Sequence, residues 1–231
     1  EDYKGQRPPT PDRLKQQFGL VRELYQKMGI VALGHENYEA DDLIATIAKQ
    51  AEAQAMEVQV VSSDKDLLQI ISDHTQVFVP KSNSFGKDIN YTPSSFFDKF
   101  EIHVDQWTLY KALVGDKSDN IIGANKIGPK TAVSLIREYQ SLDKILQAAK
   151  NGELKPAQNK NISEAAEQLV NNLKLVTLVD DIDLDITLDD LVFSGFSNEE
   201  LLTFFHRHGM QRHLTSFQKI MGKTTEVKGS D

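Results

Sequence analysis

Carboxylate side chains gather in three short segments of this sequence, at spacings that suit metal chemistry. Oxygen ligands without cysteine suit hard cations, chiefly Mg²⁺ or Mn²⁺. Two such ions about 4 Å apart would activate water and stabilise the leaving oxygen in a phosphodiester displacement. The clusters therefore predict a two-metal site, provided that the fold brings them together. The acidic residues are Glu39, Asp41 and Asp42, then Asp64 and Asp66, then Asp116 and Asp119.

Each acidic cluster also has an ordinary structural explanation. Acidic residues in a first helical turn interact favourably with the helix dipole, by a few tenths to about 1 kcal/mol. Asp and Asn are common in turns because they hydrogen-bond the local backbone. Taken together, the clusters favour a site, because the first two follow predicted strands, where open α/β sheets place ligands. Converging carboxylates would also repel one another unless cations neutralised them.

A second candidate site is the segment 123–132, which ends in a predicted helix start at Pro129. Free backbone N–H groups at a helix N-terminus can hold a phosphate. Lys126 and Lys130 add positive charge, and Arg137 follows two turns later. Such a segment could hold a DNA backbone without reading its sequence. The alternative is an ordinary helix-turn-helix corner with solvated lysines.

Composition excludes several classes of protein. Of the 231 residues, 39% are hydrophobic and 26% charged, which is typical of a globular chain with a real core. No apolar run is long enough for a membrane span. The absence of cysteine excludes disulfides, thiolate zinc sites and cysteine nucleophiles. The net charge of −8 argues against a general basic coat for nucleic acid, but it permits a local basic strip beside metal-bound carboxylates.

Hydrophobic periodicity in the first ninety residues predicts strands that alternate with helices. Such alternation is typical of a parallel or mostly parallel sheet covered on both faces. The first helix should carry an amphipathic stripe and have Thr10 as its N-cap. The predicted elements are helices from Thr10-Pro11 to Gly29, from Glu39 and from Ser63, strands at 30–33, 58–61 and 77–79, and a polar loop or hairpin at 81–90.

After Thr92 the sequence predicts helices only, with a core that includes Trp107. We expect a polar connection at 151–161 and a frayed polar tail from Gly222. The predicted architecture is an α/β domain followed by a helical domain. The predicted boundaries are 1–100 for the α/β core, 101–222 for the helical domain and 223–231 for a tail or linker.

Five motifs resemble, in order and separation, those of the 5′→3′ exonuclease domain of bacterial DNA polymerases I, within the flap endonuclease superfamily. The resemblance covers nearly the whole chain. It implies a PIN-like α/β nuclease core joined to a helix-three-turn-helix (helix-hairpin-helix-like) DNA-binding domain. The motifs are Tyr3-Lys4-Gly5-Gln6-Arg7-Pro8-Pro9-Thr10-Pro11, Tyr38-Glu39-Ala40-Asp41-Asp42, Ser63-Asp64-Lys65-Asp66-Leu67, residues 112–120 (ALVGDKSDN) and residues 127–132 (IGPKTA).

The resemblance also implies roles for individual residues. Lys4 and Arg7 match a basic pair at the base of a helical arch, where they would stabilise charge on the scissile phosphate. The turn that holds duplex backbone, with K⁺ as a candidate ion, matches Gly123, Lys126, Gly128, Lys130 and Thr131. By the same resemblance, Glu39, Asp41 and Asp42 would hold the first Mg²⁺ or Mn²⁺ ion, and Asp64, Asp66, Asp116 and Asp119 the second.

The implied activity is structure-specific 5′ nuclease action on 5′ flaps and on nicked or gapped duplexes, in DNA replication and repair. A metal-bound hydroxide would attack the phosphate and expel the 3′ oxygen, leaving a 5′-phosphate. The resemblance further implies a monomer in the bacterial cytoplasm, associated with the nucleoid and not with a membrane. A C-terminal polymerase domain is the implied partner in the full-length protein.

Two departures from the family leave other functions open. Ile122 and Lys126 stand where the family usually has proline and glycine. The family also has a first strand and two aspartates upstream of the Tyr-Lys-Gly-Gln-Arg motif, so we expect a truncated start that lacks them and most of the arch. A DNA-binding module without catalysis is therefore the alternative. A PIN-like ribonuclease is disfavoured, because a duplex-binding domain would be superfluous in it.

Overall fold

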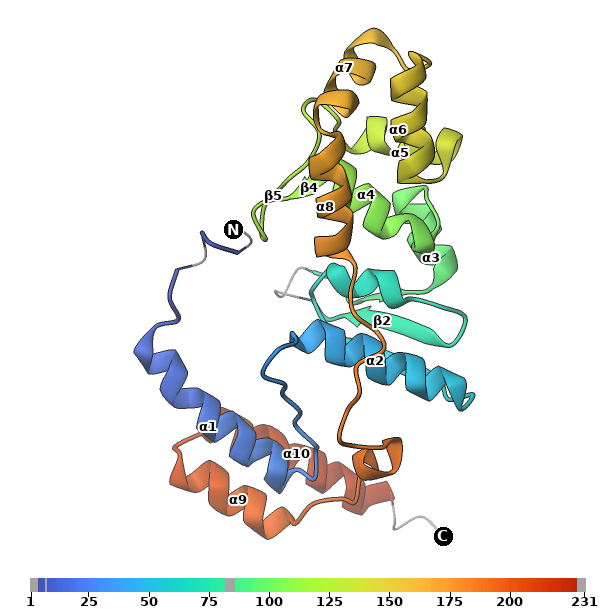
Figure 1. Cartoon of the computed structure of the whole chain (residues 1–231). Coiled ribbons are helices and arrows are strands. Elements are labelled where there is room, and N and C mark those ends of the chain that lie inside the picture. Colours follow the sequence, from blue (N-terminus) through green and yellow to red (C-terminus); the bar gives the residue numbers. More distant parts are fainter. Residues whose placement is uncertain (1–3, 7, 82–85, 228–231) are drawn as a thin grey trace. The chain divides into compact units, whose positions relative to one another are not determined.

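The structure of the chain is a computed structural model that describes residues 4–6, 8–81 and 86–227 (Figure 1). Arg7, one of the predicted catalytic residues, lies outside the described residues. The chain divides into two compact units: residues 1–8 with 34–184, and residues 9–33 with 185–231. The domain boundary at residue 100 stays a prediction. No helix among the described residues is long and apolar enough to cross a membrane.

The first unit contains a three-stranded sheet in the order β1-β2-β3. Strand β1 (Val58–Val61) pairs in parallel with β2 (Thr75–Val79), which pairs antiparallel with β3 (Ile89–Tyr91). The sheet is therefore small and mixed, not mostly parallel as predicted. The segment 62–74 is long enough for a crossover, whereas the connection from β2 to β3 is short, and short connections join antiparallel strands.

Two elements of the first unit lead into the predicted acidic clusters. Helix α2 (Ala40–Ala53) begins at the first cluster and packs against β1, with its small apolar face buried. The second cluster follows β1 and opens the 3₁₀ helix η1 (Asp66–Ile70). The prediction that Ser63 caps this helix is wrong, because the N-cap residue of η1 is Lys65. The turn before η1 is closed by Ser62, whose hydroxyl accepts a hydrogen bond from the Asp64 N–H at 3.0 Å.

Between Pro93 and Val176 the regular elements are helices, as predicted, apart from a short hairpin of β4 (Gly115–Asp116) and β5 (Ile121–Ile122). Part of the predicted polar connection is a helix, because Pro156 takes a first helical position, where the missing N–H costs nothing. The helices are α3 (Pro93–Phe100), η2 (Val104–Gln106), α4 (Trp107–Val114), α5 (Pro129–Tyr139), α6 (Leu142–Asn151), α7 (Pro156–Glu164) and α8 (Ala166–Val176).

One apolar core joins the sheet and the helices of the first unit. Phe96 is fully buried, and its ring meets Trp107 edge-on at a centroid distance of 5.4 Å. Trp107 is a core residue, as predicted, and its indole N–H donates a hydrogen bond to the Lys65 carbonyl at 2.9 Å. The core therefore fixes α4 against the segment that carries Asp64 and Asp66.

The second unit consists of α1 (Asp12–Lys27), η3 (Leu188–Leu191), α9 (Asn198–Arg207) and α10 (Gln211–Val227). Helix α1 packs against α9 through its C-terminal turns, while much of its predicted apolar stripe is exposed. Its N-cap is Pro11, one residue later than predicted. Helix α10 continues to residue 227, so the frayed tail predicted from residue 222 is wrong over that stretch.

The buried strand predicted at residues 30–33 is absent from the described structure. These residues have no regular secondary structure, and Ile30 and Val31 are 42% and 44% exposed. An apolar run becomes a strand only when a neighbouring strand satisfies its backbone groups. The described residues offer no such neighbour to this segment.

Replacing Phe96 tests the position of this core. We expect Phe96→Ala to lower the free energy of unfolding by about 3–5 kcal/mol, because it leaves a cavity beside Trp107. Its neighbour Phe97, which is 41% exposed, provides the matched control, and Phe97→Ala should cost clearly less. Urea denaturation measures both losses, and equal losses would contradict the assignment of Phe96 to the core.

Candidate metal centre

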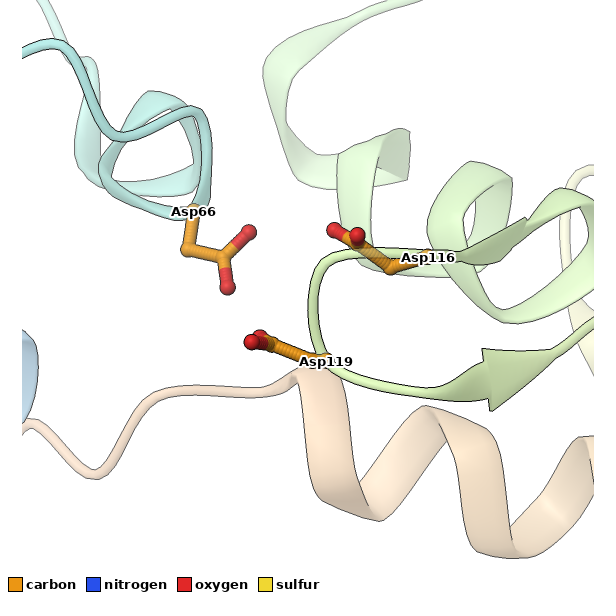
Figure 2. Close-up of side chains that lie close together, drawn as sticks. All are labelled: Asp66, Asp116 and Asp119. Carbon is orange, nitrogen blue, oxygen red and sulfur yellow. The ribbon is translucent and has the colours of Figure 1, made fainter. Parts of the chain in front are cut away.

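Three predicted carboxylates meet in the first unit. One oxygen each from Asp66, Asp116 and Asp119 lies within 4.8 Å of the others. Figure 2 shows Asp66 at the start of η1 pointing toward the other two, which lie on the β4–β5 hairpin. Three oxygen donors at this spacing suit a hard divalent cation. The donor set therefore fits a metal ion of the kind that the sequence predicts.

The tight backbone conformation of Gly115, at the base of the hairpin, brings Asp116 and Asp119 close together. Gly115 has a φ of +83°, and a Cβ there would clash with the backbone of Ile121 and Gly123. Only glycine adopts this conformation without strain and leaves room for the second strand. The turn is fixed further by the Ser118 N–H, which donates to Asp116 Oδ1 at 2.8 Å.

A buried lysine lies between two of the carboxylates. Lys111 on α4 is 5% exposed, and its Nζ forms ion pairs with Asp66 Oδ1 and, at 2.7 Å, with Asp116 Oδ2. Partial burial acts to raise the pKa of Asp116, but hydrogen bonds from Lys111 and Ser118 lower it to about 2. Asp116 is therefore ionised at neutral pH.

Sequence reasoning did not single out Lys111. The available signal was a lone charge inside the apolar run Trp107–Val114, five residues before Asp116. A lysine in such a run is either solvated at its tip or paired in the interior. The pairing depends on Asp66, 45 residues earlier in the chain, which no local pattern reveals.

The acidic clusters share one cavity of about 760 Å³. Burial raises the pKa of Asp41, and the charges of Asp64 and Glu39 raise it further, while Lys4 lowers it. Carboxylates in this cavity therefore destabilise one another's charged forms, which a bound cation would relieve. The predicted ligands among its lining residues are Asp41, Asp64, Asp66 and Asp116.

The remaining predicted ligands have other partners. Asp42 Oδ2 accepts a hydrogen bond from the Glu39 N–H at 3.0 Å, and Asp42 Oδ1 accepts one from the Val179 N–H at 2.9 Å. These bonds cap α2 and attach the segment after α8. Asp42 thus has a structural role, and its metal role stays a prediction. The Lys4 ammonium pairs with the Glu39 carboxylate, and the Lys4 N–H donates to the Asp119 carbonyl at 3.1 Å.

The predicted phosphate-binding turn lies between β5 and α5. Gly123 packs so closely on the end of α4 that a Cβ would clash with the carbonyl groups there. Lys126 has a φ of +58°, so the departure from the family's glycine places a side chain in the left-handed region. Gly128 is the N-cap of α5, followed by Lys130 and Thr131 in its first turn. Lys126 and Lys130 are exposed.

A buried amide holds this turn against the neighbouring helices. The Asn172 side chain on α8 donates hydrogen bonds to the Ile122 carbonyl at 2.8 Å and to the Ala112 carbonyl at 3.1 Å. Asn172 is 5% exposed, so these bonds satisfy a polar group that would otherwise be costly to bury. The same contacts position the β4–β5 hairpin, and with it Asp116 and Asp119.

The fold and the carboxylate cluster define a nuclease-type domain, and sequence comparison assigns its family. The chain belongs to the 5′-3′ exonuclease family. Residues 1–101 match its "5'-3' exonuclease, N-terminal resolvase-like domain", and residues 102–199 match its "5'-3' exonuclease, C-terminal SAM fold". The resemblance inferred from the motifs is therefore confirmed, as is the order of an α/β domain followed by a helical one.

Among curated proteins, the chain is similar to part of bacterial DNA polymerases I. The chain is 37% identical over 220 residues to DNA polymerase I of Bacillus caldotenax, covering 94% of this chain and 25% of that protein. It is 34% identical over 205 residues to DNA polymerase I of Bacillus subtilis, covering 89% of this chain and 23% of that protein. The chain thus spans about a quarter of the length of these curated relatives.

Solved structures share the fold. A T5 5′-exonuclease described with bound zinc has a TM-score of 0.63 and 25% identity, covering 89% of this chain and 75% of that chain. The T5 D15 flap endonuclease, in a variant described as a complex with DNA and metal ions, has a TM-score of 0.62 and 24% identity, covering 97% of this chain and 77% of that chain.

The tight base of the hairpin can be tested by adding one methyl group. We expect Gly115→Ala to lower the free energy of unfolding by more than about 1 kcal/mol, because it combines a positive φ with a backbone clash. Gly34→Ala is the matched control, since a Cβ at Gly34 meets nothing within 4 Å. Urea denaturation compares the two, and an unchanged Gly115→Ala variant would refute the close packing.

Proposed function

We propose that this chain is a structure-specific 5′ nuclease that hydrolyses DNA phosphodiester bonds with divalent metal ions. Its substrates would be 5′ flaps and nicked or gapped duplexes, as in primer or flap removal during replication and repair. The observation that carries the proposal is the convergence of Asp66, Asp116 and Asp119 in a chain of the 5′-3′ exonuclease family. The zinc described in the T5 relative supports a divalent ion.

The chain's own residues would divide the work between metal binding and charge stabilisation. Asp66, Asp116 and Asp119 would hold one Mg²⁺ or Mn²⁺ ion, with Asp64 beside them in the cavity. Asp41, Glu39 and Asp42 would serve the other ion, although both oxygens of Asp42 already accept backbone hydrogen bonds. A bound divalent ion supplies Lewis acidity and lowers the pKa of water. The substrate phosphate would meet the positive charges of Lys4 and Arg7.

The turn before α5 would hold the duplex. Its exposed Lys126 and Lys130 and the free N–H groups at the start of α5 offer a phosphate both charge and directed donors. Gly128 and Thr131, at the start of α5, would contact the DNA backbone, and Gly123 would hold the turn against α4, with K⁺ as a candidate ion. The T5 structure described with DNA supports a nucleic-acid partner for this fold.

The relatives also suggest the setting of this domain. Because they are bacterial DNA polymerases I of about four times its length, we propose that the chain is the exonuclease part of such a protein. It would then act in the bacterial cytoplasm at the nucleoid, as a monomer with a C-terminal polymerase domain.

One observation favours a second candidate function, DNA binding without catalysis. The Lys111 ammonium already pairs with Asp66 and Asp116, so part of the negative charge of the cluster is compensated without a metal ion. A Mg²⁺-dependent cleavage assay on a labelled 5′-flap duplex separates the two functions. Metal-dependent cutting supports the nuclease, whereas flap binding with no cutting at any Mg²⁺ or Mn²⁺ concentration supports the binding module.

Asp116→Asn tests the metal-ligand role directly. We expect it to abolish cleavage and to leave flap affinity within about tenfold, because the change removes a ligand charge but no predicted DNA contact. Asp98→Asn, on the exposed face of α3, is the control and should cleave normally. A large loss of flap affinity in Asp116→Asn would contradict the assignment.

Lys130→Ala tests the duplex-binding turn. We expect weaker flap binding and a salt dependence of affinity that is lower by roughly one, since one phosphate contact is lost. Lys150→Ala, an exposed lysine on α6, should leave the slope unchanged. Fluorescence anisotropy at several salt concentrations gives the slope for each variant. If Lys130→Ala and Lys150→Ala had equal slopes, Lys130 would be an ordinary solvated lysine without a phosphate contact.

A further inference from the structure

The buried ammonium of Lys111 has no part in the proposed hydrolysis, yet it lies inside the metal centre. Lysine is almost never this buried unless its charge is paired. Its two partners come from separate elements, Asp66 from η1 and Asp116 from β4. Lys111 is therefore a bridge between the two segments that supply the predicted ligands.

Electrostatics explains why such a bridge is needed. The three carboxylates of Asp66, Asp116 and Asp119 approach one another within 4.8 Å in a site where the first two are largely shielded from water. Like charges at this distance repel one another more strongly when they are partly desolvated than they do in water. A compact, strongly hydrated point charge such as an ammonium offsets that repulsion without a metal ion.

We propose that Lys111 is an internal counter-cation with two effects. It preassembles Asp66 and Asp116 in the metal-free chain, and it weakens the binding of the divalent ion by competing for the same carboxylates. The inference rests on the proposed function, in that these aspartates bind a divalent ion. An ion that enters the cluster meets carboxylates whose negative charge one ammonium already partly compensates, and the ion is repelled by that ammonium.

The competing explanation is a purely structural salt bridge between α4 and η1. The two explanations differ in how metal acts on a variant that lacks the charge. If Lys111 is a counter-cation, a divalent ion replaces its function. If it is only a structural bridge, added metal stabilises the variant no more than it stabilises the unaltered chain.

The experiment compares the unaltered chain with Lys111→Met, using Mn²⁺ alone as the probe. Thermal unfolding is measured with and without Mn²⁺, and calorimetry gives the dissociation constant. Without metal, we expect the midpoint of Lys111→Met to fall by about 10 °C, because two buried carboxylates lose their partner. Saturating Mn²⁺ should remove most of that difference, and the Mn²⁺ dissociation constant should fall by at least about tenfold.

The matched control is Lys117→Met, which removes a positive charge from the lining of the same cavity. Lys117 is exposed, and the described residues show no ion pair between it and Asp66 or Asp116. We expect its unfolding midpoint and its Mn²⁺ affinity to stay close to those of the unaltered chain. If Lys117→Met had an effect as large as that of Lys111→Met, the loss of any positive charge from the cavity would explain both results, and the proposal would be overturned.

A second variant keeps the test decisive if Lys111→Met does not fold without metal. Adding Asp66→Asn to Lys111→Met removes one of the uncompensated charges, so the metal-free double variant should regain stability. Its failure to do so would overturn the counter-cation role, as would a Lys111→Met chain that binds Mn²⁺ no more tightly. Absence of Mn²⁺ binding by the unaltered chain is a separate result, which would overturn the proposed function itself.

Discussion

Mutual repulsion among carboxylates is the constraint on which this structure depends. The fold brings acidic side chains from α2, η1 and the β4–β5 hairpin toward one cavity, and each ionised group makes the next less stable there. Their convergence requires positive charge within reach. In the described structure that charge comes from Lys111 on one side and Lys4 on the other. The acidic net charge of the whole chain says nothing of this local balance.

The scaffold has to hold the acidic segments close before any ligand arrives. Trp107 attaches α4 to the Lys65 carbonyl, so the helix that carries Lys111 is fixed beside the second acidic cluster. Gly115 lets the two strands of the hairpin pack closely, and the Asn172 side chain on α8 hydrogen-bonds the carbonyl groups of both the hairpin and α4. Residues that are not themselves predicted metal ligands therefore determine the spacing of Asp66 and Asp116, as the rigidity of a preorganised site demands.

Much of this arrangement could be predicted from the sequence. The strands at 58–61 and 77–79, the core role of Trp107 and the convergence of Asp66, Asp116 and Asp119 are all found in the structure. These features follow from local patterns or from motifs whose order fixes a family. Residues 30–33 show the limit, since an apolar run does not become a strand without a partner. Lys111 shows a second limit, because its partner Asp66 lies 45 residues earlier in the sequence.

The two sides of the acidic cavity differ in what neutralises them. On one side, Lys111 and Ser118 hold the pKa of Asp116 at about 2 against the effect of burial, so its charge is already stabilised. On the other side, burial and the neighbouring charges of Asp64 and Glu39 raise the pKa of Asp41. Both carboxylate oxygens of Asp42 accept hydrogen bonds from backbone N–H groups, which stabilises the start of α2. The fold itself thus stabilises the ionised form of Asp116. A cation that enters the cavity would stabilise the ionised form of Asp41 more, because fewer positive groups of the protein already do so.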